Sequence, residues 1–229
     1  MKRIGLLGGM SWESSDLYYE LINELVRERL GGVHSADCVM ISVDFDDIEK
    51  LQAAGEWDAA GERLAFEAQR LVAAGAELMV LCTNTMHKVA DAIQAAVDVP
   101  LLHLGDVTAK AAQEAGCREL GLLGTGFTMA QDFYRDRIAS HGLTVLVPDD
   151  DQQAMVHRVI YDQLVRGIVR EESRAAYAAV IDELVSRGCD GIILGCTEIE
   201  LLVGQDDSPV PVLPTTRLHA IAAVDAALA

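Results

Sequence analysis

The sequence is short of basic and aromatic residues. Its 229 residues include 36 acidic but only 18 basic side chains, which gives a formal net charge of −18 at pH 7, and aromatic residues make up 5%. A surface this negative repels phosphate backbones and anionic lipid headgroups, so we expect neither a nucleic-acid nor a membrane partner. The hydrophobic content of 51% supplies an aliphatic core and excludes disordered, collagenous and coiled-coil proteins.

Long hydrophobic runs and paired cysteines are also missing. No apolar stretch approaches the roughly 20 residues of a membrane-spanning helix. The apolar segment after Lys2 and Arg3 meets Glu13 and Asp16 too soon for a secretory signal and is better interpreted as a first strand. An odd number of widely spaced cysteines argues against disulfides and zinc, so we expect a cytoplasmic protein with free thiols and no bound metal. The cysteines are Cys38, Cys82, Cys117, Cys189 and Cys196.

Short apolar runs alternate with stretches in which apolar residues recur three and four positions apart. One such helical stripe runs from Leu17 to Val26 and stops at Gly31 and Gly32. This alternation predicts parallel sheets that are covered by helices on both faces. The expected strands are residues 3–7, 39–43, 78–82, 100–104, 120–123, 144–147, 191–194 and 210–213.

Three motifs occur twice in the same order, at nearly equal offsets of 116, 114 and 111 residues. We therefore predict an α/β protein of two similar flavodoxin-like domains, related by a pseudo-twofold axis, with the active site in the interdomain cleft. The first domain would contain residues 1–103 and 210–229, and the second residues 104–209. The motif pairs are IGLLGGM (4–10) with LGLLGTG (120–126), AGAELMVLCTNT (74–85) with RGCDGIILGCTEI (187–199), and VPLLH (99–103) with VPVLP (210–214).

The repeat places a Cys-Thr pair after a strand in each half. Ligands of parallel α/β sheets bind beyond the carboxyl ends of the strands, so Cys82 and Cys196 would face each other across the cleft. Two opposed thiols suit inversion at a carbon stereocentre, because one thiolate removes a proton and the other thiol returns one to the opposite face. An ordinary thiol pKa of about 8.5 makes both protonation states accessible. Cys38, Cys117 and Cys189 accompany no motif and are interpreted as structural.

These motifs resemble those of the aspartate/glutamate racemase family over the whole chain, and most closely the broad-specificity bacterial amino-acid racemases. The carriers of the resemblance are GLLGGM (5–10), VDFDDIE (43–49), LCTNTMH (81–87), LGTGFTM (123–129) and GCTEIELL (195–202). The resemblance implies cofactor-independent racemisation of an anionic amino acid in a homodimer, with Cys82 and Cys196 as the catalytic residues. It also implies a carboxylate site at helix starts, formed by Met10, Thr83, Asn84, Thr85, Thr125, Thr197 and Glu198.

The sequence departs from the family in two places. Aspartate-specific members carry an arginine where this chain reads FDDIEKLQ, so Gln52 and Arg166 become the candidates for the distal group of the substrate. Glutamate racemases of the cell-wall branch carry a histidine where this chain has Glu198. These departures favour glutamate or a broader range over strict aspartate specificity. Arg166 has an alternative interpretation as a cation at a helix end.

Other cofactors and functions receive less support. The glycine-rich turns do not spell the dinucleotide motif GxGxxG, and the opposed cysteines make a pyridoxal-phosphate lysine unnecessary. The acidic runs 44–47 and 149–151 lack the pattern of a calcium loop, and the second is typical of a helix N-terminus. Two alternatives stay open: a cysteine-dependent isomerase or decarboxylase of a small dicarboxylic acid, and a non-catalytic amino-acid-binding protein. His87 could orient a cysteine or simply be a satisfied buried side chain.

Overall fold

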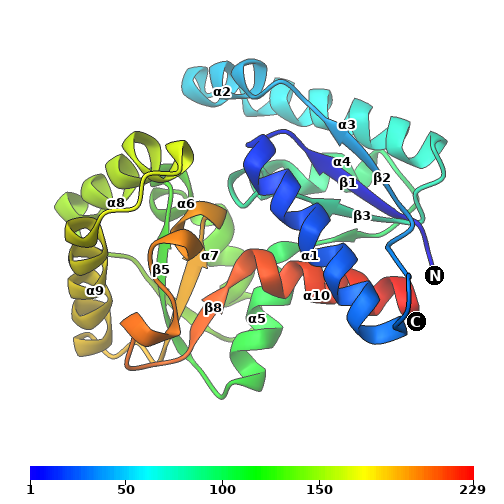
Figure 1. The fold of residues 1–229 in the computed structure, drawn as a ribbon. Helices are drawn as coiled ribbons and strands as arrows, with labels where there is room; N and C mark the ends of the chain where they lie inside the picture. The colour runs from blue at the N-terminus through cyan, green and yellow to red at the C-terminus, as the bar shows by residue number, and fades with distance from the viewer. The chain divides into compact units, whose positions relative to one another are not determined.

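Eight strands form two separate four-stranded parallel sheets in the computed structural model, which describes all 229 residues (Figure 1). The strand orders, β2-β1-β3-β4 and β6-β5-β7-β8, are the same when strands are counted within each half, and both follow the flavodoxin-like order. The prediction of two similar α/β halves is confirmed, and all eight expected strands are present. They are β1 (Ile4–Gly8), β2 (Cys38–Ser42), β3 (Leu78–Leu81), β4 (Leu101–Leu102), β5 (Glu119–Gly124), β6 (Thr144–Leu146), β7 (Gly191–Gly195) and β8 (Val212–Pro214).

Helices connect the strands in both halves. Ten α-helices and four short 3₁₀ helices occupy the segments where helical periodicity was expected. The α-helices are α1 (Trp12–Leu30), α2 (Phe45–Ala54), α3 (Trp57–Ala73), α4 (Ala90–Ala95), α5 (Leu104–Glu114), α6 (Gly126–Ala130), α7 (Asp132–Ala139), α8 (Asp150–Asp162), α9 (Glu171–Ser186) and α10 (Thr215–Leu228). The 3₁₀ helices are η1 (Thr85–Val89), η2 (Leu164–Arg166), η3 (Thr197–Leu201) and η4 (Gln205–Asp207).

Helix ends carry the signals that the sequence contains. The Ser11 hydroxyl accepts the N–H of Ser14 at the start of α1, and Gly31 ends this helix with a positive φ of 73°. The side chains of Asp149 and Gln152 form a capping box at the start of α8. The predicted α1 stripe and the predicted N-terminus at residues 149–151 are therefore both confirmed.

The first unit has an aliphatic core on each face of its sheet. On one face, Leu6 and Val80 pack with Ile22 of α1 and Val224 of α10. The other face packs against α2, α3 and α4 in a second cluster of buried residues. In the second unit, α6, α8 and α9 pack against β5. The cores are mainly aliphatic, as the composition predicts, but Tyr18, Tyr134 and Tyr177 are among the largest fully buried side chains.

The boundary between the two halves differs from the expected one. The first unit consists of residues 1–104 and 219–229, and the second of residues 105–218. The predicted assignment of residues 210–218 to the first domain is wrong, because β8 pairs with β7 as the fourth strand of the second sheet. The repeated VPVLP segment thus takes the same sheet position as VPLLH. Only the part of α10 from His219 onward packs with the first unit.

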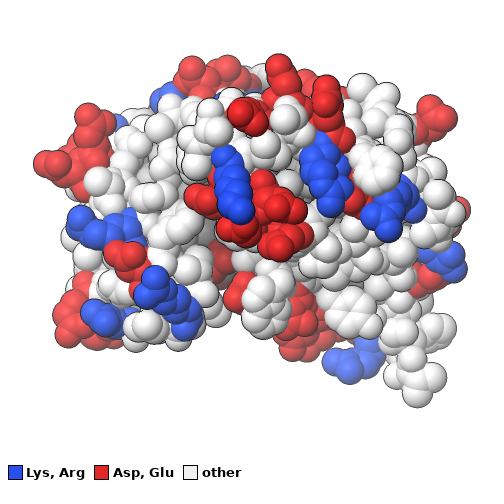
Figure 2. All heavy atoms as spheres, turned by 90° about the horizontal axis from the view of Figure 1, so that it is seen from above, with Lys and Arg blue, Asp and Glu red and all other residues white.

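The surface reflects the unequal charge of the sequence. Acidic and basic side chains are interspersed on the face drawn in Figure 2, where acidic side chains gather in several patches. None of the helices combines the length and the apolar character that a bilayer span requires.

The backbone at Gly9, just after β1, passes very close to the backbone of Val43. Its φ is +93°, and a Cβ there would lie 2.2 Å from the carbonyl oxygen of Val43. Gly31 also has a positive φ, of +73°, but a Cβ there would meet nothing within 4 Å. Because only Gly9 adds overpacking to backbone strain, we expect Gly31→Ala to cost about 1–2 kcal/mol and Gly9→Ala at least about 3 kcal/mol. Urea unfolding of both variants measures the difference, and equal losses would contradict the packing argument.

Candidate active site

Cys82 stands at the carboxyl end of β3, one residue beyond the last paired position. Its N–H donates to the carbonyl of Leu7 at 2.9 Å, and the Ser14 hydroxyl donates to its carbonyl at 3.1 Å. The side chain is fully buried. Gly8, the last residue of β1, lies beside Cys82. A Cβ added to Gly8 would lie 3.9 Å from the Cβ of Cys82 and only 2.4 Å from the Ser15 hydroxyl. The glycine therefore allows α1 to begin directly beside the cysteine.

Cys196 stands at the matching place in the second sheet, directly after β7. Its thiol donates to Oε2 of Glu198 at 2.9 Å, and the backbone N–H groups of Glu198 and Ile199 interact with the sulfur. The exposed fraction of Cys196 is 8%. Each cysteine thus follows a strand, as the repeat predicts, and begins a turn that continues into a 3₁₀ helix.

The surroundings of both thiols disfavour the thiolate form, for partly different reasons. Burial raises the pKa of the Cys82 thiol above its usual range. Burial also raises the pKa of Cys196, and the Glu198 carboxylate raises it further, while the two backbone N–H groups oppose this by stabilising the thiolate. A bound cation would therefore favour the thiolate in either place, because it offsets the cost of burying negative charge.

The predicted carboxylate-binding residues of the first half lie in the turn that follows Cys82. Thr83, Asn84 and Thr85 are all buried; Asn84 directly precedes η1 and Thr85 is its first residue. Met10 lies in the loop after β1, but its side chain packs into the core cluster that contains Val43. Only the backbone of Met10 can therefore serve a ligand.

Gln52 lies close to this turn but faces Met86. It is buried on α2, and its side-chain amide donates to Sδ of Met86 at 2.9 Å. A thioether is a weak acceptor, so a stronger acceptor on a ligand could replace it. The structure thus places Gln52 beside η1 without giving it a strong polar partner.

The predicted binding residues of the second half come from three different elements, and only two of them belong to the Cys196 turn. Thr197 and Glu198 belong to that turn, and Thr125 begins α6, where its hydroxyl accepts the N–H of Thr128 at 3.3 Å. Arg166 is exposed at the end of η2, which packs against η3. The structure therefore brings the element that carries Arg166 to the element that carries Thr197 and Glu198.

Sequence reasoning missed two polar residues next to the Cys196 turn. The N–H of Thr216 donates to Oε1 of Glu200 at 3.3 Å, and the Thr216 hydroxyl donates to the Thr197 hydroxyl at 3.3 Å. Burial raises the pKa of Glu200 to about 7, against the hydrogen bonds from Thr216, which lower it. The available signal was the spacing of Glu200 after Cys196, which nearly matches that of His87 after Cys82.

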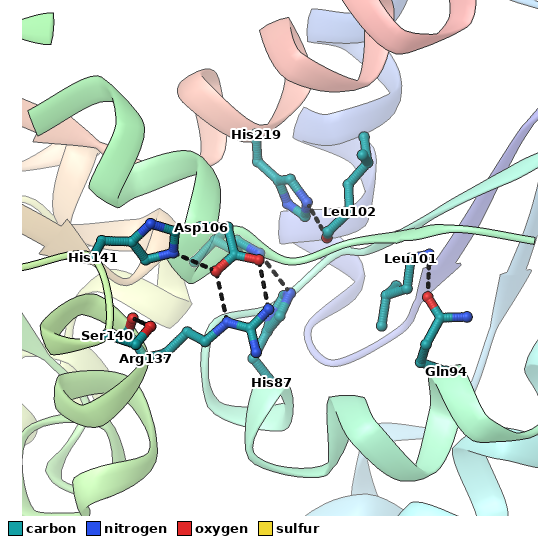
Figure 3. Close-up of polar contacts among 10 residues, drawn as sticks. His87, Gln94, Leu101, Leu102, Asp106, Arg137, Ser140, His141 and His219 are labelled. Carbon is teal, nitrogen blue, oxygen red and sulfur yellow. Dashed lines mark hydrogen bonds and ion pairs between the residues drawn. The ribbon is translucent and has the colours of Figure 1, made fainter. Parts of the chain in front are cut away.

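Two further polar clusters, drawn in Figure 3, do not include the cysteine turns. In the second unit, Arg137 and His141 both contact the carboxylate of Asp106 (Figure 3). In the first unit, His219 donates to the carbonyl of Leu102 at 2.9 Å and accepts from the Tyr18 hydroxyl, and burial lowers its pKa to about 4. No group of three or more His, Cys, Asp and Glu side chains is arranged to hold a metal ion.

Comparisons with known proteins cover the whole chain. The sequence profile of the Asp/Glu/hydantoin racemase family matches residues 7–223. The broad-specificity amino-acid racemase RacX of Bacillus subtilis (strain 168) is 24% identical over 243 residues, which are 99% of this chain and 98% of RacX. The crystal structure of a provisionally assigned Asp/Glu racemase from Yersinia pestis has 53% identity and a TM-score of 0.95, with 100% of both chains covered. An aspartate racemase homologue from Pyrococcus horikoshii OT3 has 32% identity and a TM-score of 0.89, also with 100% of both chains covered.

The Glu198 carboxylate can be tested as a cause of the high thiol pKa of Cys196. A negative charge beside a thiol disfavours the thiolate, so Glu198→Gln should lower the pKa of Cys196. The pH midpoint for alkylation of Cys196 by iodoacetamide should therefore move to lower pH, as measured by mass spectrometry of the labelled peptides. Cys82, whose pKa is raised by burial alone, is the internal control and should not move. An unchanged midpoint at Cys196 would contradict this assignment.

Proposed function

This chain belongs to the Asp/Glu/hydantoin racemase family, and from that membership we propose that it interconverts the L and D enantiomers of glutamate or aspartate, and of some neutral amino acids, without a cofactor. The observation that carries the proposal is the placement of Cys82 and Cys196. They follow matching strands of two sheets with the same strand order. The turn after Cys82 carries the buried polar side chains Thr83, Asn84 and Thr85, and the turn after Cys196 carries the buried Thr197.

The proposed reaction uses the two thiols as opposite proton carriers. One cysteine thiolate takes the α-proton and becomes a thiol, and the bonding electrons move into the substrate carboxylate. The other cysteine thiol gives its proton to the opposite face of the α-carbon and becomes a thiolate. The reverse reaction exchanges these roles, so atoms and charges balance in both directions. The proposal requires the α-carbon to lie between the two sulfur atoms.

The substrate carboxylate would bind at the cysteine turns. The hydroxyls of Thr83, Thr85 and Thr197 and the backbone N–H groups of the turns are donors, and donors at helix starts favour anions. During proton removal, negative charge builds up on the carboxylate, so these fixed donors would stabilise the transition state more than the bound substrate.

The substrate ammonium would supply the positive charge that the buried thiols lack. The pKa values of both thiols are raised by burial, so the empty site strongly disfavours a thiolate. An ammonium group next to the α-carbon brings a positive charge close to the sulfur and lowers the thiol pKa. In this proposal the enzyme forms its catalytic base only when an amino acid is bound.

Side-chain specificity would come from Arg166 and, to a smaller degree, Gln52. The turns that bind the carboxylate contact groups common to all amino acids, so discrimination requires a residue that meets the distal end of the substrate. A single exposed arginine holds a distal carboxylate less rigidly than two cationic groups would. The activity on neutral amino acids follows from this loose arrangement, and the likeness to RacX supports it. The family resemblance also leads us to propose a cytoplasmic homodimer.

Single cysteine variants test the two-thiol mechanism. Cys82→Ser and Cys196→Ser should each lower racemisation by about 10²–10⁴-fold, because each removes one proton carrier. Each variant should still exchange the α-proton of one enantiomer with solvent deuterium, and the exchanged enantiomer should differ between the two. Chiral chromatography with mass spectrometry measures both quantities, and Cys38→Ser is the control. Full activity in both single variants would disprove the mechanism.

Arg166→Ala tests the source of acidic-side-chain preference. Loss of a charge-assisted hydrogen bond worth about 1.5–3 kcal/mol should raise KM for glutamate or aspartate by roughly 10- to 100-fold. KM for a neutral amino acid should stay within about threefold, well below that range. Arg170→Ala, which removes an exposed arginine at the start of α9, is the matched control. Equal effects on acidic and neutral substrates would show that Arg166 is only a structural cation.

A further inference from the structure

Each cysteine turn is followed by one side chain that accepts a hydrogen bond from a distant helix start. In the first half this side chain is His87 of η1, five residues after Cys82, and in the second half it is Glu200 of η3, four residues after Cys196. Neither residue has a place in the proton transfer proposed above. His87 nevertheless contacts the Cys82 turn, and Glu200 belongs to the 3₁₀ helix that continues the Cys196 turn.

His87 connects the Cys82 turn to the start of α5. The N–H of Leu104, the first residue of α5, donates to Nε2 of His87 at 3.1 Å. Because Nε2 accepts, the ring proton of neutral histidine is on Nδ1, which donates to the carbonyl of Thr83 at 2.7 Å. Burial and the neighbouring rings of His103 and His219 keep the pKa of His87 well below its usual value, so the ring is held neutral and in this one tautomer.

Glu200 and Thr216 make the corresponding connection between the Cys196 turn and the start of α10. The N–H of Thr216, the second residue of α10, donates to Oε1 of Glu200, and the Thr216 hydroxyl donates to that of Thr197. A helix start has unpaired N–H groups and a partial positive charge, so both acceptors are well placed there.

The two connections occupy matching positions of the repeat. Thr83 and Thr197 each follow a cysteine, and α5 and α10 each follow the fourth strand of their sheet. The acceptor differs, an imidazole nitrogen in one half and a carboxylate oxygen in the other, but each accepts a backbone N–H from the helix that follows the fourth strand. The contact with the threonine also differs, because His87 bonds the Thr83 carbonyl itself, whereas the Thr216 hydroxyl reaches Thr197 in the second half. This correspondence is difficult to explain if each residue only fills space in the core.

We propose that His87 and Glu200 are equivalent positioning residues, each of which holds the cysteine turn of its own half against the helix that follows the fourth strand. The proposal rests on the function inferred above only in its consequence for catalysis. A thiol that carries a proton must stay within about 3–3.5 Å of the α-carbon, so a small displacement of its turn slows the reaction without preventing binding.

The test measures the reactivity of each cysteine separately in the full-length protein. His87→Leu and Glu200→Leu remove the acceptors, whereas His87→Gln and Glu200→Gln keep a side-chain oxygen that can accept the same N–H. Glu67→Gln and Tyr134→Phe are matched controls, because each changes a buried polar side chain of one half that contacts neither cysteine turn. Iodoacetamide labelling is followed by peptide mass spectrometry, together with kcat and KM.

We expect selective loosening. His87→Leu should speed the labelling of Cys82 by about tenfold and that of Cys196 by less than twofold. Glu200→Leu should speed the labelling of Cys196 by about tenfold and that of Cys82 by less than twofold. The size follows because the loss of one hydrogen bond changes an equilibrium constant by about tenfold. The same variants should lower kcat by about tenfold and change KM by less than threefold. The glutamine variants should restore most of both losses, and the controls should show no selectivity.

Three results would overturn the proposal: equal changes at both cysteines, no change at either, or glutamine variants that behave like the leucine variants. The labelling result does not depend on turnover. A protein that racemises no amino acid but shows the selective pattern would disprove the proposed function and retain the positioning role. Normal racemisation without the selective labelling pattern would disprove the positioning role and leave the proposed function intact.

Discussion

The close approach of the chain to itself at the carboxyl ends of the central strands is the constraint on which the rest of the structure depends. A Cβ at Gly8 would lie 2.4 Å from the Ser15 hydroxyl, and one at Gly195 would lie 3.1 Å from the carbonyl oxygen of Leu123. At Gly8 an added Cβ would force a neighbour to move, whereas at Gly195, the last residue of β7, it would make a tight contact. Given that approach, Ser14 reaches the carbonyl of Cys82, and a helix begins beside the cysteine rather than a longer loop. Gly8 of the first glycine-rich motif is therefore a structural requirement of the Cys82 site, and its presence does not imply phosphate binding.

The two halves share their topology but differ in the chemistry around the cysteines. Cys82 is surrounded by apolar strand and helix residues, and burial alone raises its pKa. Cys196 has a carboxylate partner in Glu198 as well as backbone N–H donors. The acceptors that follow also differ, an imidazole in one half and a carboxylate in the other. The repeated topology thus gives the two thiols the same position in their sheets, while the neighbouring side chains give each thiol a different electrostatic environment. A common backbone position for both thiols is what the proposed two-thiol reaction would require, and different side chains around them are compatible with it.

Much of the fold could be predicted because its signals are local. Short apolar runs gave all eight strands, and the Cys-Thr pairs placed both turns at strand ends. The remainder depends on contacts between distant residues. Nothing in the local sequence shows that Met10 packs into the core or that the Gln52 amide faces Met86, because the direction of a side chain depends on its tertiary neighbours. Glu200 was missed for the same reason, since its partner Thr216 lies 16 residues away. The position of β8 could have been predicted by carrying the repeat through to its fourth strand.

Symmetry also limits what the different thiol environments can do in a racemase. Enantiomers have the same free energy in water, so the equilibrium constant is one, and kcat/KM must be equal in the two directions. The Glu198 carboxylate beside Cys196 therefore cannot favour one direction in kcat/KM. It can change kcat/KM only by the same factor in both directions, and it can make kcat and KM differ between the directions only by a common factor, through how tightly each enantiomer binds. Identical environments are thus unnecessary, but both thiols must be positioned equally well, since the slower proton transfer limits both directions. That requirement accounts for a backbone repeat that is kept more closely than the side chains around it.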